Sequence, residues 1–137
     1  VFTFTNSSNE SQNAVLKNVT TTISGSLVAD DGTSTVYLYN SSSFDSAHEM
    51  GSGDCGFSSS TDSCQVNITL TASESEVSGD QNVYVVLDTS GGTHFTESTN
   101  ATETLTAKLD NFVYDDGPDA TVTPVTGVPV YAGTVTY

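Results

Sequence analysis

Hydrophobic and polar residues alternate along most of this chain, and no apolar repeat of 3.6 residues is sustained. Alternation with a period of two places successive side chains on opposite faces of a β-strand. The alternating segments are separated by clusters of Gly, Asp, Asn and Ser, which favour turns. The pattern predicts strands at Val1–Thr5, Ala14–Ser24, Ser34–Asn40, Gln65–Ala72, Asn82–Asp88, Ala101–Leu109, Ala120–Val125 and Val128–Tyr137.

Such a series of short strands predicts an all-β fold, an antiparallel β-sandwich of about seven to nine strands with an Ig-like or jelly-roll-like arrangement. The 137 residues suffice for one hydrophobic core. We expect residues 14–137 to form the sandwich, and residues 1–13 to supply an N-terminal strand and a polar tether. Residues 41–64 are polar without alternation, which predicts a surface loop. The predicted core comprises Val36, Leu38, Val66, Ile68, Leu70, Val83, Val85, Leu87, Leu105 and Leu109.

Two cysteines, Cys55 and Cys64, lie nine positions apart in the predicted loop. A polar, glycine-flanked setting is a poor place to bury free thiols, so we expect a disulfide that staples the loop. A zinc site is not expected, because it needs four ligands and only His48 lies nearby.

The asparagines, like the expected disulfide, indicate a secreted protein. Nine are present, and six begin an Asn-x-Ser/Thr triplet, the acceptor for N-linked glycans. The alternation directs Asn18 and Asn67 away from the apolar face of their strands, where a glycan is sterically allowed. The competing interpretation is chance, because 22 Thr and 20 Ser make accidental triplets common. The six candidate sites are Asn6, Asn9, Asn18, Asn40, Asn67 and Asn100.

The charge balance excludes several partners. Asp and Glu number 17 against two lysines and no arginine, which gives a formal net charge of −15. Two cations cannot neutralise a nucleic-acid backbone, and an anionic membrane surface would repel the chain. No run of 18 apolar residues is present, so no membrane span is expected. The first residue is not Met and no leader precedes it, as in a mature secreted chain. We therefore expect an extracellular protein at the cell surface.

Candidate catalytic groups are sparse. His48 and His94 are the only side chains whose ordinary pKa lies near neutrality, and each is expected to be a solvated loop residue. No nucleophile-elbow pattern accompanies the many serines. There is no arginine to clamp a substrate carboxylate or phosphate, and no Trp to form a sugar-binding platform. The sequence therefore predicts that the protein is not an enzyme and requires no cofactor beyond N-linked glycans.

Two further kinds of site are weighed against simpler interpretations. Asp115, Asp116 and Asp119 lie in one tight turn and could supply oxygens to Ca²⁺, but solvated turn carboxylates are the favoured interpretation. Lys17 and Lys108 lie within predicted strands, and Lys17 is expected on the apolar face of its strand. Such a lysine could form an intramolecular isopeptide bond with Asn or Asp, although a strand lysine more often extends to solvent at a sheet edge.

The Thr-, Ser- and Val-rich strands, the Asp-rich turns DDGTS and DDGPDATVTP, the scarcity of Lys and Arg and the many Asn-x-Ser/Thr triplets occur together over the whole chain. In these features the chain resembles secreted surface proteins of archaea, especially those of salt-loving organisms. Within that group it looks like a subunit of a donor-strand filament, a pilus or thread. The resemblance implies a glycosylated structural protein that assembles head to tail with copies of itself.

The proposed donor is the strictly alternating strand Val1, Phe2, Thr3, Phe4 and Thr5, followed by the polar run Asn6–Asn13. A terminal strand of this kind could pair with its own sheet or complete the sheet of a neighbour. The N-terminal assembly helix of type IV pilins and archaellins is missing from this sequence, so only the globular head of such a protein would fit. That head domain, a virion or surface-layer decoration protein, and a monomeric extracellular binding module are the alternatives.

Overall fold

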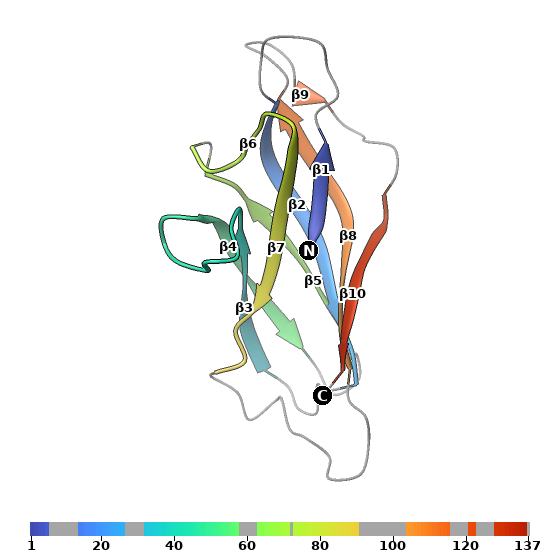
Figure 1. The fold of residues 1–137 in the computed structure, drawn as a ribbon. Coiled ribbons are helices and arrows are strands. Elements are labelled where there is room, and N and C mark those ends of the chain that lie inside the picture. The colour runs from blue at the N-terminus through green and yellow to red at the C-terminus, as the bar shows by residue number, and fades with distance from the viewer. Residues whose placement is uncertain are drawn as a thin grey trace.

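The computed structural model describes residues 1–5, 14–26, 32–57, 63–71, 73–90, 104–115, 121–122 and 128–136 (Figure 1). Two antiparallel sheets pack face to face, which confirms the predicted all-β sandwich. Among the described residues, the structure contains no helix of the length and apolarity that crossing a membrane requires.

The first sheet has the order β1-β7-β3-β4. Its strands are β1 (Phe2–Thr5), β7 (Asp80–Leu87), β3 (Gly32–Tyr39) and β4 (Glu49–Phe57). The central strands follow the predicted alternation: Val36 and Leu38 point into the core, whereas Tyr37 lies on the opposite face of β3. This sheet therefore presents an inner apolar face and an outer face that carries tyrosines.

The second sheet has the order β10-β8-β2-β5, and two short strands extend it at one end. Its long strands are β10 (Val130–Thr136), β8 (Thr104–Asp115), β2 (Ala14–Ser24) and β5 (Ser63–Thr69). The short strand β6 (Glu76–Val77) pairs with β2, and β9 (Thr121–Val122) pairs with β8.

One hydrophobic core lies between the sheets, and all of the predicted core residues belong to it or pack against it. Several other residues, which were not among the predicted core positions, are buried there as well, notably on β1, β2 and β4. These are Phe2, Phe4, Leu16, Val19, Ile23, Met50, Cys55, Phe57, Cys64 and Val77.

The prediction of a continuous loop over residues 41–64 is wrong at Glu49–Phe57, which form strand β4. The inward-facing positions of this strand include Gly51 and Gly53, so the hydrophobic alternation that marks a strand is interrupted. Strand β8 also continues beyond the predicted end at Leu109, as far as Asp115. The long pairing of β2 with β8 supports this continuation.

Candidate functional site

Strand β1 forms one edge of the first sheet and is anchored by two phenylalanines. It pairs antiparallel with β7, and Phe2 lies opposite Val83. Phe2 and Phe4 are only 4% and 8% exposed. The ring of Phe4 meets that of Phe112 on β8 edge to face, with centroids 4.9 Å apart, so β1 contacts both sheets.

The alternate residues of β1 face outward and bond to β7 alone. Thr3 Oγ1 donates a hydrogen bond of 2.8 Å to Asn82 Oδ1, and Thr5 Oγ1 donates one of 2.8 Å to Asp80 Oδ1. The four consecutive residues of β1 thus contact β7 and the hydrophobic core. We call this pairing the β1–β7 seam.

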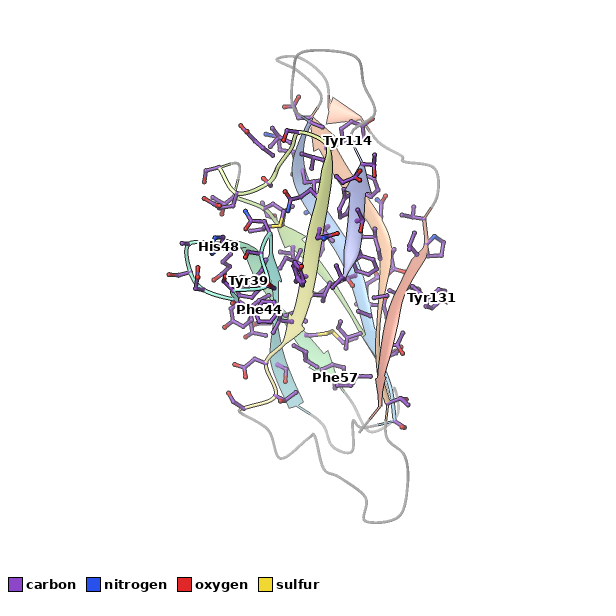
Figure 2. The ribbon with its side chains drawn as sticks, viewed as in Figure 1. Tyr39, Phe44, His48, Phe57, Tyr114 and Tyr131 are labelled. Carbon is purple, nitrogen blue, oxygen red and sulfur yellow. A yellow bond between two sulfur atoms is a disulfide. The ribbon has the colours of Figure 1, made fainter. Side chains whose placement is uncertain are left out.

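The outer face of the first sheet carries an aromatic cluster, which we call the aromatic patch: Tyr37 and Tyr39 on β3, Tyr84 on β7, and Phe44 in the loop between β3 and β4. Figure 2 shows Tyr39 and Phe44 next to each other. The ring centroids are 6.1 Å apart for Tyr37–Tyr39, 5.5 Å for Tyr39–Phe44 and 5.8 Å for Phe44–Tyr84. Tyr39 and Tyr84 are partners in the β3–β7 register, so sheet pairing sets the base of the patch.

Phe44 covers this base while remaining exposed. Tyr39 is only 8% exposed beneath it, whereas Phe44 itself is 49% exposed. The Phe44 backbone has φ of 49°, in the left-handed region that residues with a side chain adopt rarely. Burial, followed by the nearby charges of Glu49, Tyr37 and Asp45, raises the pKa of Tyr39 above its usual value of 10.0.

The loop that carries Phe44 is closed by local hydrogen bonds. The Asn40 amide donates to the His48 carbonyl oxygen at 3.0 Å, and the Ala47 amide donates to Asp45 Oδ1 at 3.0 Å. The ring of His48 bonds to the same carboxylate through Nδ1 at 2.7 Å. This side-chain hydrogen bond is the main reason that the pKa of Asp45 lies below 3.8.

The Asp45–His48 pair is the only arrangement in the described residues with the carboxylate–imidazole geometry of a catalytic dyad. Both side chains are largely exposed. A triad would also need a hydroxyl or thiol against the other ring nitrogen, and the contacts of the described chain place none there. The second histidine considered in the sequence, His94, lies outside the described residues.

Three of the six predicted glycosylation sites can be located. Asn18 and Asn67 lie on the outer face of the β2–β5 pair, where the Asn18 amide donates to Asn67 Oδ1 and Asn67 Nδ2 donates to Thr20 Oγ1 at 3.3 Å. Asn40 instead donates to the Glu74 carbonyl oxygen at 3.1 Å. The remaining sites, Asn6, Asn9 and Asn100, lie outside the described residues.

The predicted disulfide is present and joins the two sheets. Cys55 on β4 and Cys64 on β5 are bonded, with Cα atoms 5.6 Å apart, and both are buried. Its position differs from the expectation of a stapled loop, because each cysteine belongs to a strand at the edge of its sheet. The bond therefore fastens one side of the sandwich.

Each lysine lies beside an aspartate of β8. Lys17 Nζ is 3.8 Å from Asp115 Oδ2, and Lys108 Nζ is 2.6 Å from Asp110 Oδ1. The Lys17 side chain is 40% exposed, and the position predicted for it on the apolar face is wrong. A register shift between Leu16 and Asn18 turns Leu16 into the core instead. The distances and partial exposure at both sites are those of ion pairs.

No calcium-binding cluster is formed by the described residues. Asp115 is described and lies beside Lys17, whereas Asp116 and Asp119 are outside the described part of the chain. Of the three aspartates that could bind Ca²⁺, only Asp115 therefore belongs to the described residues.

Comparison with protein-family models, with curated proteins and with solved structures finds no significant match to this chain.

The aromatic patch was not predicted from the sequence. Phe44 lies in the segment 41–64, for which the sequence predicted a polar surface loop and no aromatic cluster. The available signal was local: Phe44 is a single large apolar residue after the run Asn40–Ser43. Such a residue in a polar loop indicates either a contact with the neighbouring sheet or an exposed binding group.

Proposed function

We propose that this protein is a structural subunit of an extracellular, glycosylated cell-surface filament, assembled head to tail by exchange of strand β1. The observation that carries the proposal is the β1–β7 seam. Four residues make all of the described contacts of β1, and Phe2 and Phe4 supply its two buried anchors. A second copy of the same strand would make the same contacts, so exchange between subunits conserves the interface.

The repeated contact would be heterologous, because the strand of one subunit enters the sheet of the next. Heterologous contacts that do not close produce an open filament. Eight residues lie between Thr5 and Ala14, so the two Cα atoms can be at most about 32 Å apart in an extended chain. This length limits how far a receiving subunit can lie from the donor.

The extracellular location has independent support. The Cys55–Cys64 disulfide is of the kind that persists in oxidising compartments. Asn18 and Asn67 lie on an outer sheet face, where the bulk of a glycan is sterically allowed. The strong acidity of the chain is consistent with a surface protein of a high-salt habitat, because salt screens the repulsion between carboxylates.

A cross-linking experiment can distinguish exchange from self-pairing. Thr3 and Asn82 are register partners with touching side chains, so the T3C/N82C double variant should form a disulfide across the seam. In assembled material we expect this bond to join different chains and to give a ladder of covalent multimers on non-reducing gels. The Y37C/S52C variant is the matched control, because Tyr37 and Ser52 pair within the first sheet and should bond within one chain.

Electron microscopy of native material should show regular filaments, and deletion of Val1–Thr5 should abolish them. A T3C/N82C protein that remains entirely monomeric under assembly conditions would reject strand exchange. A monomer that stays folded and dispersed after the deletion would favour the alternative of a monomeric binding module. Filaments that survive the deletion would instead require another interface, as in a pilin head or surface-layer decoration domain.

A further inference from the structure

The aromatic patch is open to solvent at Phe44 and is therefore not a second hydrophobic core. Phe44 is one of only four large hydrophobic residues that the described structure exposes, and its ring packs against Tyr39 and Tyr84. Its left-handed backbone is held by a loop closed from Asn40 to His48. Backbone strain of this kind clusters at ligand-binding sites, so the strained loop that presents the Phe44 ring is a candidate contact surface.

Negative charge borders these rings. Glu49 lies directly opposite Tyr39 in the β3–β4 register, on the same face of the sheet. Asp45 lies one residue after Phe44 and is held by its bond to His48. Both carboxylates contribute to the raised pKa of Tyr39, after the larger effect of burial. The patch thus combines the exposed ring of Phe44 and the partly buried rings of Tyr37 and Tyr84 with two anionic groups.

From this geometry we infer that the aromatic patch binds an arginine-bearing segment of a basic protein partner. A guanidinium can stack on the ring of Phe44 or Tyr37, and the electrostatic attraction of the cation to the ring adds to the contact. The same planar group can bond to the carboxylate of Glu49 with two parallel N–H donors, which an ammonium cannot do.

A second copy of this chain is a poor source of that cation. The chain contains no arginine, and its two lysines lie in the second sheet beside Asp115 and Asp110. The partner must therefore be a different protein, so the inference does not rest on filament assembly and would hold for a monomer.

A neutral sugar fits the surroundings of the patch less well. Sugar hydroxyls require donors as well as acceptors. The tyrosine hydroxyls of the patch can donate, but the neighbouring amide donors have partners within the chain. Asn40 Nδ2 bonds to the carbonyl and carboxylate oxygens of Glu74, and Gln81 Nε2 bonds to the carbonyl oxygens of Asn40 and Asn82. The patch therefore offers carboxylate acceptors, which match a cationic donor.

The test uses the full chain and a short peptide in which arginine alternates with glycine. Titration into ¹⁵N-labelled protein should shift the amide signals of Tyr39, Phe44 and Glu49 in a saturable way. Phe44→Leu keeps an apolar side chain but removes the ring, and we expect it to weaken binding about two- to fivefold. Tyr37→Leu should also weaken binding, which covers the case in which the Phe44 variant alters its loop.

Controls separate this mode of binding from general attraction to an acidic protein. Tyr131 is 70% exposed and lies on the opposite side of the sandwich from the patch (Figure 2), so Tyr131→Leu should leave the affinity unchanged. A peptide with glutamine in place of arginine should not bind. Equal affinity for wild type and Phe44→Leu, shifts spread over the whole surface, absence of saturable binding, or preference for a neutral oligosaccharide would each overturn the inference.

Discussion

At the residue scale, two glycines allow β4 to lie closer to β5 than a strand with side chains could. A Cβ at Gly51 would lie 2.6 Å from the Thr69 carbonyl oxygen, and one at Gly53 would lie 2.7 Å from Val66 Cγ2. Because a methyl group at either position forces its neighbours to shift, we expect Gly53→Ala to lower the free energy of unfolding by about 1–3 kcal/mol. Urea denaturation of both proteins measures the difference.

Gly56 provides the control within the same strand. A Cβ there would meet no atom within 4 Å, so Gly56→Ala should change the free energy of unfolding by less than about 0.5 kcal/mol. Equal losses for the two variants would mean that strand β4 tolerates alanine poorly everywhere, and that the close approach to β5 is not the cause.

Asp110 should make the free energy of unfolding depend on pH in the acid range. Burial alone raises the pKa of this carboxyl, but hydrogen bonds from Lys108, Thr22 and Gln65 outweigh burial and lower its pKa below 3.8. The pKa is thus lower in the folded than in the unfolded protein. The resulting stability is fully present above the unfolded pKa and is lost as pH falls through the folded value.

We therefore expect Asp110→Asn to reduce stability at neutral pH and to flatten its decline as the pH falls below the ordinary Asp pKa of about 3.9. Urea denaturation at a series of pH values measures both effects. An acid decline as steep in Asp110→Asn as in the wild type would assign that decline to other carboxylates.

At the element scale, β1 should be separable from the remainder of the sandwich. Phe4→Ala removes the ring that meets Phe112, and buried Phe→Ala changes cost about 3–5 kcal/mol. We expect this loss to appear as local opening of the β1–β7 seam, because β1 has one strand neighbour. Hydrogen exchange should accelerate at the β7 amides opposite β1 while protection in the centre of the β2–β8 pair persists.

Thr3→Ala is the matched control, because it removes one outward hydrogen bond from the same strand and leaves both anchors. It should have a much smaller effect on exchange in β7. Uniform acceleration across both sheets in Phe4→Ala would show that β1 unfolds only with the whole domain, which would weaken the case for strand exchange.

Most strands could be predicted because each one alternates by itself, as in β5, where Cys64, Val66 and Ile68 are buried and the residues between them are exposed. Strand β4 could not be predicted in this way. Its inward positions 51 and 53 are glycines because β5 leaves no room for side chains, and the close approach therefore erases the pattern that would reveal the strand. The face predicted for Lys17 was wrong for a related reason. The β-bulge beside it arises from the pairing of β2 with β8, and the sequence of β2 alone does not reveal it.

The candidate sites also differ in whether a local sequence pattern could predict them. The Cys55–Cys64 bond follows from cysteines close in the sequence, and so it could be predicted. The aromatic patch depends on Tyr39 pairing with Tyr84 and on a loop that returns Phe44 to them. Those contacts are long-range, and no local pattern specifies them.

At the scale of the whole molecule, the two sides of the sandwich are held in different ways. On one side a disulfide and glycine-permitted contacts fasten β4 to β5. On the other side, the short strand β1 pairs with β7, and its Phe4 meets Phe112 of β8. Figure 1 shows β1 beside both β7 and β8. The fastened side is covalently closed, whereas the other side is closed by one short edge strand. This difference is consistent with the proposed exchange of β1.

The excess of carboxylates should make the stability of the whole domain depend on salt. With a net charge of −15, like charges repel in the compact state, and salt screens this repulsion. We expect the melting temperature at neutral pH to rise when NaCl increases from about 0.1 to about 1 M. Near the isoelectric point of 4.1 the net charge vanishes, so the same addition should have little effect. A rise of equal size at both pH values would contradict charge screening and would indicate a general salt effect on apolar burial.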